Sequence, residues 1–193
     1  MRGALLAAAA AVLVAPAAAH AATYPVTTAD DHVDAAGCTP ADCTLREAFA
    51  KAEDDDDIQL GAGTYRLASE LTSTNHVTLV GAGARSTVVD GAEKTRLLDV
   101  QAASLEVHGI HFAHGNAAAG EGGAIAVQPD ARLTLFDSAV TDSASASPGG
   151  GIVSQGDLTV ESSLVARNTA GAGGGGISAY ETGSLELVNT TVS

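Results

Sequence analysis

Residues 149–168, GGGIVSQGDLTVESSLVARN, contain the pattern that decides the fold. Leu158 and Val160 alternate with Thr159 and Glu161, as in a short strand with one buried and one exposed face. Glycine and asparagine interrupt the apolar positions and mark turns. This stretch therefore predicts short strands joined by tight turns.

Two series of landmarks repeat in step along the chain. Glycine clusters precede Ile125, Ile152 and Ile177, which are 27 and 25 residues apart. Strand-like runs begin 28, 25 and 27 residues apart, at Leu105, Leu133, Leu158 and Leu185. No helical pattern separates the strands, which excludes a βαβ repeat. One coil of three short strands fits this period, so we expect an all-β fold, a right-handed parallel β-helix solenoid.

The composition excludes several classes of partner. The 193 residues include 23 acidic and 9 basic side chains, a formal net charge of -14, which disfavours nucleic acids and anionic membranes. Aromatic residues make up 3% of the chain and tryptophan is absent, so the core must be aliphatic and few rings can stack on sugars.

The first 21 residues, MRGALLAAAAAVLVAPAAAHA, have the features of a secretory signal peptide. Arg2 precedes an apolar run that is too short to span a membrane as a helix, and Ala19-His20-Ala21 matches a cleavage site. No other stretch could cross a bilayer. We therefore expect a secreted protein, extracellular or on the cell surface, with no transmembrane segment after cleavage.

Residues 22–57 form an N-terminal segment with a cysteine pair and a capping helix. In an exported chain, Cys38 and Cys43 predict a local disulfide; a metal site is the less favoured alternative. Thr44 and Glu47 form a capping box, and the helix should end before the acidic run 54–57. Residues 58–193 are expected to form the coils. The last run, 185–193, shows no cap, so its strand edge is expected to continue or to pair with a partner.

Two motifs carry a resemblance to known families. CTLREAF (43–49) and DDIQLGAGTYRL (56–67) resemble the N-terminal motif of bacterial exported CSLREA-domain proteins. VTLVGAGARSTVVDG (77–91) and LEVHGIHFAHGN (105–116) resemble the first coils of pectate-lyase-like β-helices, and GGAI (122–125) resembles polymorphic outer-membrane protein repeats. The resemblance implies export and a β-helix, and no single chemistry.

The sequence offers few candidate ligands for a cofactor or metal. GAGARS (81–86) matches part of a dinucleotide-binding fingerprint but precedes a strand, so it is interpreted as a turn. His108, His111 and His114 lie outside the apolar positions and are candidate metal ligands, unless the turn at Gly109 points them apart. No cofactor is expected, apart from weak calcium binding at the acidic run 54–57.

Catalytic residues are equally scattered. Asp137 and Asp142 are the nearest carboxylate pair, expected to straddle a turn, and the candidate base is Arg96, Arg85 or Lys94. The prediction is therefore an exported, non-catalytic β-helix with an adhesive, structural or binding role, whose partner is a glycan or a protein at the cell surface. The alternative is a carbohydrate-active β-helix enzyme, a polysaccharide lyase or glycoside hydrolase.

Overall fold

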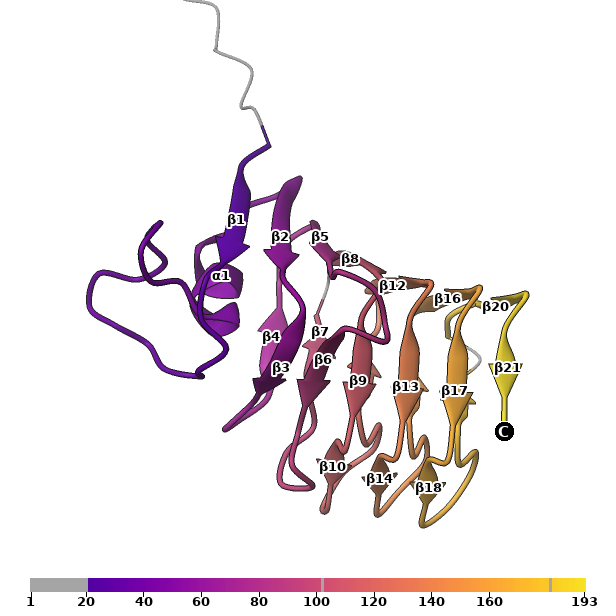
Figure 1. Cartoon of the computed structure of the whole chain (residues 1–193). Helices are drawn as coiled ribbons and strands as arrows, with labels where there is room; N and C mark the ends of the chain where they lie inside the picture. The colour runs from indigo at the N-terminus through magenta and orange to yellow at the C-terminus, as the bar shows by residue number, and fades with distance from the viewer. Residues whose placement is uncertain (1–20, 102, 181) are drawn as a thin grey trace, which may run out of the picture.

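The computed structural model describes residues 21–101, 103–180 and 182–193. The predicted signal peptide therefore lies outside the described residues, except for Ala21. The chain winds into a solenoid of about five turns, and each turn passes through several parallel sheets (Figure 1).

Four parallel sheets run along the solenoid, and we name them sheets A to D. Sheet A consists, in spatial order, of β1 (Thr23–Val26), β2 (Asp56–Leu60), β5 (Val77–Val80), β8 (Ser104–His108), β12 (Arg132–Phe136), β16 (Asp157–Glu161) and β20 (Leu185–Val188). Sheet B consists of β3 (Gly63–Arg66), β6 (Thr87–Asp90), β9 (His111–Ala113), β13 (Ala139–Thr141), β17 (Leu164–Ala166) and β21 (Thr191–Val192).

The other two sheets complete each turn. Sheet C consists of β4 (Leu71–Ser73), β7 (Leu98–Val100), β11 (Ile125–Val127), β15 (Ile152–Ser154) and β19 (Ile177–Ala179). Sheet D consists of β10 (Asn116–Ala117), β14 (Ala144–Ser145) and β18 (Thr169–Ala170). The prediction of an all-β parallel β-helix with a short N-terminal helix is confirmed.

The strand register reproduces both repeat series of the sequence. In sheet A the register pairs the leucines that open successive strand-like runs, Leu105, Leu133, Leu158 and Leu185. In sheet C it pairs the isoleucines that follow the glycine clusters, Ile125, Ile152 and Ile177. Aliphatic side chains from equivalent positions therefore stack into one narrow core.

At the glycine clusters, neighbouring coils approach each other so closely that a side chain would not fit. A Cβ atom added to Gly123 would overlap the carbonyl oxygen of Gly150, and one added to Gly150 would overlap that of Gly175. The backbone N–H of Gly123 donates to the carbonyl of Gly149 in the next coil at 2.9 Å. The glycine clusters thus let adjacent coils pair backbone to backbone.

Buried or half-buried hydroxyl groups connect the coils at the corner between sheets A and B. The Oγ of Ser138 accepts from the N–H of Ile110 at 3.2 Å, and the Oγ of Ser163 accepts from the N–H of Ser138 at 3.0 Å. The Oγ1 of Thr190 accepts from the N–H of Ser163 at 3.4 Å. We call Ser138, Ser163 and Thr190 the hydroxyl ladder.

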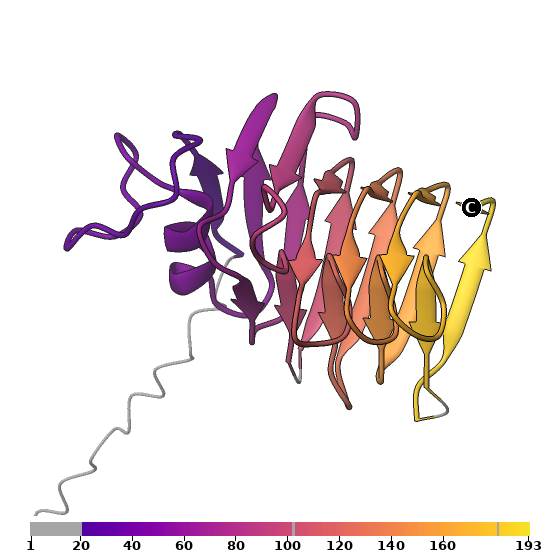
Figure 2. The same ribbon diagram turned by 90° about the horizontal axis from the view of Figure 1, so that it is seen from below.

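The helix α1 (Leu45–Lys51) lies at the N-terminal end of the stack, opposite the C-terminal strands (Figure 2). Its predicted capping box is present: the Thr44 hydroxyl accepts from the Glu47 N–H at 3.1 Å, and the Glu47 carboxylate accepts from the Thr44 N–H at 3.0 Å. The helix ends before the acidic run, as predicted. Leu45 is buried, and the helix contacts β1, β2 and β4, so it covers the end of the core.

The predicted disulfide is also present, because the sulfur atoms of Cys38 and Cys43 are bonded. At the C-terminal end of the stack, Leu185, Leu187 and Val192 are exposed. Their partners in the preceding coil, Leu158, Val160 and Val165, are buried. No helix among the described residues has the length and apolarity that crossing a membrane requires.

Candidate functional site

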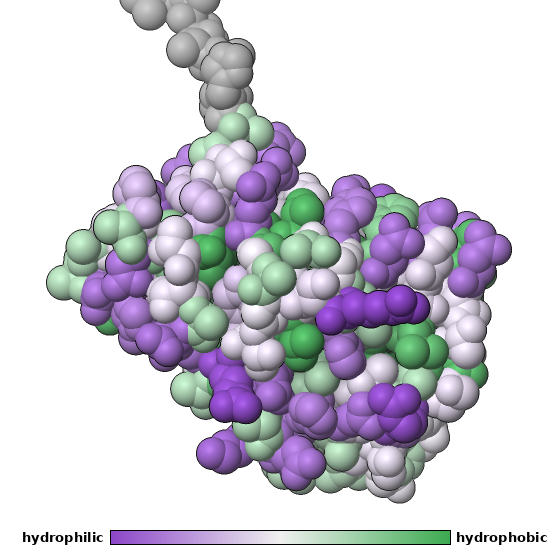
Figure 3. Space-filling view, in the orientation of Figure 1, coloured by the Kyte–Doolittle hydropathy of each residue, from purple (hydrophilic) through white to green (hydrophobic). Residues whose placement is uncertain are grey.

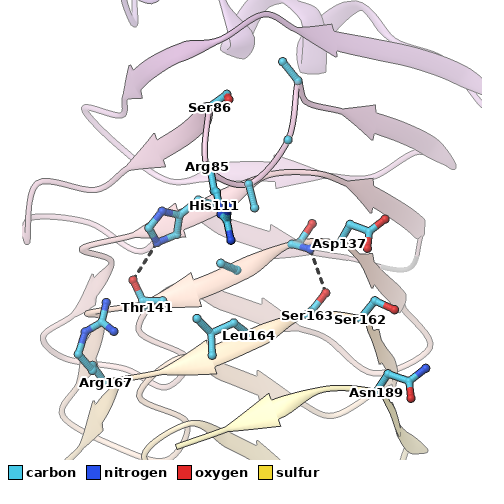
Figure 4. Close-up of a pocket in the computed structure, with 15 residues that line it drawn as sticks. Arg85, Ser86, His111, Asp137, Thr141, Ser162, Ser163, Leu164, Arg167 and Asn189 are labelled. Atoms are coloured by element: carbon cyan, nitrogen blue, oxygen red, sulfur yellow. Dashed lines mark hydrogen bonds between the residues drawn. The ribbon is translucent and has the colours of Figure 1, made fainter.

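A groove of about 880 Å³ crosses the outer face of sheet B over β9, β13 and β17. The turn 81–86 between β5 and β6 forms its upper rim, as Figure 4 shows. On this face hydrophobic residues lie between hydrophilic ones (Figure 3), so the groove is neither a purely apolar pocket nor a uniformly charged one. We call it the sheet B groove.

One wall of the groove is a column of residues at the corner between sheets A and B. Asp137, Ser162 and Asn189 line the groove and have positive φ angles of 47°, 50° and 50°. They stack because the strands that precede them, β12, β16 and β20, pair in register. The wall therefore presents a carboxylate, a hydroxyl and an amide at steps of about 4.8 Å.

A hydrogen-bonded chain crosses from the floor to the opposite side. The Nε2 of His111 lies 2.8 Å from the Oγ1 of Thr141, which donates to the Asp142 carboxylate at 2.5 Å. Arg167 donates twice to the same carboxylate, at 2.8 and 2.7 Å. Because the threonine proton is committed to Asp142, the network assigns a proton to Nε2 of His111, which donates to Thr141.

The protonation of this chain follows from its surroundings. Hydrogen bonds from Arg167 and Thr141 lower the pKa of Asp142 to about 2. Burial lowers the pKa of His111, although the nearby Asp142 opposes the shift. At neutral pH the floor thus holds a neutral imidazole beside an ionised, fully engaged carboxylate.

Arg85 lies on the rim of the groove, next to His111 (Figure 4). In the described part of the chain, Arg85 makes no ion pair and no side-chain hydrogen bond. The other five arginines of that part, Arg46, Arg66, Arg96, Arg132 and Arg167, each pair with a carboxylate. Arg85 is therefore the arginine whose guanidinium is available to a ligand.

The three candidate catalytic residues do not converge. Asp137 and Asp142 lie at opposite ends of the strand β13, not on either side of a turn as the sequence suggested. Asp137 lines the groove, whereas Asp142 is engaged by Arg167. Arg96 lies outside the groove and bonds Glu70. Among the described lining residues Asp137 is the one carboxylate. An inverting glycosidase uses two carboxylates, one on either side of the bond that it cleaves, with a water molecule beside one of them.

The three candidate histidine ligands are also separated. His108, on sheet A, stacks on Phe136 with ring centroids 4.8 Å apart, while His111 starts a strand of sheet B. His114 places its Nδ1 3.0 Å from a carboxylate oxygen of Asp90. The turn at Gly109, with φ of 64°, directs the chain from one sheet to the next.

In the acidic run 54–57, the carboxylates of Asp54 and Asp56 accept hydrogen bonds from backbone N–H groups. An Asp54 oxygen accepts from the His76 N–H at 2.8 Å, and buried Asp56 accepts from the N–H groups of Ala22 and Glu53 at 2.6 and 2.8 Å. These carboxylates therefore close the junction between the N-terminal segment and the first coils.

Ser162, Thr141, Arg167 and Asn189 were not predicted as site residues from the sequence. A signal for the wall was present, since Asp137, Ser162 and Asn189 are 25 and 27 residues apart, the repeat spacing itself. Structure and site together define a parallel β-helix with an open lateral groove of mixed polar and apolar lining. Comparisons with protein-family models, with curated proteins and with solved structures found no match.

Proposed function

We propose that this protein is exported and acts outside the cell as a non-catalytic β-helix that binds glycan in the sheet B groove. The single observation that carries the proposal is the groove lining: hydroxyl, amide and guanidinium groups accompany one carboxylate, Asp137. Such a set can hydrogen-bond sugar hydroxyls but lacks the second carboxylate of a glycoside hydrolase.

The shape of the groove favours an extended ligand. From β9 to β21 the sheet advances three strands, or about 14 Å, so a linear chain lying along the solenoid axis can contact successive coils. Hydrogen-bonding groups recur at each step, from Asp137 to Ser162 to Asn189. A repeating ligand thus meets a repeating wall.

The charge of the protein limits the class of glycan. A net charge of -14 repels a polyanionic chain. Arg85, with no carboxylate partner in the described residues, suits one isolated acidic substituent on a chain that is otherwise neutral. Among the described residues no phenylalanine, tyrosine or tryptophan lines the groove, so hydrogen bonds of about 0.5–1.5 kcal/mol each must carry most of the affinity, and binding should be weak.

Two further features support export. CTLREAF (43–49) resembles the CSLREA motif of bacterial exported proteins, and residues 1–21 have the pattern of a signal peptide. The resemblance of the first coils to pectate-lyase-like proteins supports a glycan ligand and is compatible with lateral binding.

A glycan array followed by titration of the best ligand tests the proposal. We expect Arg85→Gln to weaken binding about tenfold, and Arg66→Gln, on the same sheet outside the groove, to leave it unchanged. The proposal is overturned if Arg85→Gln binds as tightly as the wild type. It is also overturned if the protein cleaves polygalacturonate or a related glycan in the presence of calcium, which would favour a carbohydrate-active enzyme.

A further inference from the structure

Three side chains with metal-ligating atoms meet in the N-terminal segment, away from the groove. His32 and Asp34 lie on the loop after β1, and Asp42 lies within the turn closed by the Cys38–Cys43 disulfide. The Nε2 of His32 is 3.3 Å from an Asp42 oxygen and 3.9 Å from an Asp34 oxygen. One donor atom from each residue lies within 4.8 Å of the other two, which no other trio of such residues achieves in the described chain.

One of the spacings between these donor atoms already suits a single small cation. With bonds of about 2.1 Å and tetrahedral angles, two ligand atoms on zinc are about 3.4 Å apart. The separation of 3.3 Å between the Nε2 of His32 and a carboxylate oxygen of Asp42 already matches this value. Asp34 is exposed, so a rotation of its carboxylate can complete the set.

The backbone that carries the donors is held in place without a metal. The Glu47 carboxylate accepts from the Asp34 N–H at 2.7 Å, and the Thr44 hydroxyl donates to the His32 carbonyl at 2.9 Å. Both contacts come from the capping box of α1. On the other side, the Thr39 hydroxyl accepts from the Asp42 N–H at 3.1 Å inside the disulfide turn. A metal ion would therefore meet ligands whose main chain is already ordered.

The donor set selects the class of cation. An imidazole nitrogen with two carboxylates suits zinc and related divalent transition metals, whereas calcium takes six to eight oxygen ligands. The side chains of His32, Asp34 and Asp42 remain 37%, 59% and 46% exposed, which leaves room for water as a fourth or fifth ligand.

We propose that His32, Asp34 and Asp42 bind one divalent transition-metal ion of the zinc class. The ion would join the loop after β1 to the disulfide turn beside α1. It would thereby fasten the segment that covers the N-terminal end of the core. The site is independent of the sheet B groove and of the function proposed for it.

The test uses the untagged chain titrated with zinc by calorimetry, and with cobalt(II) by visible absorption. We expect one ion per chain and a cobalt spectrum of four or five coordination. His32→Gln and Asp42→Asn should each weaken binding at least tenfold. The matched controls are His76→Gln and Asp30→Asn, an exposed histidine and an exposed acid that the site does not use; both should bind as the wild type does.

Stability gives a second readout that does not depend on one variant. Zinc should raise the thermal midpoint of the wild type and leave that of the triple variant H32Q/D34N/D42N unchanged, and circular dichroism would confirm that the triple variant is folded. The proposal is overturned if wild type and triple variant bind zinc equally. It is also overturned if calcium competes as well as zinc does, or if binding is lost only on replacing the histidines of the coils.

Discussion

Replacing Ser138 with alanine tests the hydroxyl ladder. Ser138 is 3% exposed, and its Oγ accepts from the Ile110 N–H at 3.2 Å and donates to the Phe136 carbonyl at 2.7 Å. Ser138→Ala removes both bonds. The Phe136 carbonyl keeps a second donor, the Gly109 N–H at 3.0 Å, so it remains satisfied. The N–H of Ile110, a fully buried residue, has no other acceptor among the described residues and loses its partner.

The expected loss is the cost of that one orphaned donor. A buried N–H without a partner costs about 1–3 kcal/mol. In a chain of this size 1 kcal/mol shifts the thermal midpoint by about 2–4 °C, so Ser138→Ala should lower the midpoint by about 2–12 °C. Ser163→Ala should cost a similar amount, because the N–H that it leaves without a partner belongs to Ser138, which is 3% exposed.

Thermal and urea unfolding followed by far-UV circular dichroism measure this loss. Ser69→Ala is the matched control, since Ser69 is exposed and its hydroxyl makes no hydrogen bond in the described chain; its effect should stay within about 0.5 kcal/mol. If Ser138→Ala were as stable as Ser69→Ala, the ladder would contribute nothing, and the reasoning from buried donors would be refuted.

Three further outcomes are expected. Replacing Cys38 and Cys43 with serine should cost about 2 kcal/mol, the chain-entropy value for so short a loop, measured by urea unfolding with the reduced wild type as control. NMR titration should give His111 a pKa below 6.5, because burial disfavours the imidazolium, and Asp142→Asn should lower this pKa further. Since the unfolded state binds the proton more tightly than the folded state, His111 should destabilise the fold as pH falls through about 6.5. An unshifted His111 would contradict the buried floor. Gly150→Ala should destabilise by several kcal/mol, since its methyl overlaps the neighbouring coil; an alanine variant of wild-type stability would contradict the stacking.

The register of the coils could be predicted from sequence because burial forces one residue type to recur. The leucines and isoleucines of the two repeat series occupy equivalent inward positions, and those that lie between two coils are buried in the core. The capping box could also be predicted from the sequence, because the Thr44 and Glu47 side chains each hydrogen-bond the other residue's backbone N–H, and this requires a fixed spacing of three residues.

The site could not be predicted in the same way, because outward positions carry no such constraint. His111, Ala139 and Leu164 occupy equivalent positions in sheet B, yet the first is a titratable imidazole and the other two are aliphatic side chains of different size. The histidine spacing suggested one surface, but the positive φ of Gly109 divides those residues between two sheets. Arg85 was assigned to a turn and named as one candidate base, but its place over β9 follows only from the fold.

The parallel sheets also determine how this protein would carry load. The strands lie across the solenoid and their hydrogen bonds point along its axis, so tension applied between the two ends pulls on one inter-coil ladder after another instead of shearing all of them together. A repeat is released when the ladders of sheets A to D between two coils have opened, and 25 to 28 residues extend to about 90 Å. A stretched molecule would therefore lengthen in steps of one coil, dissipating energy at each step while the remaining coils stay folded.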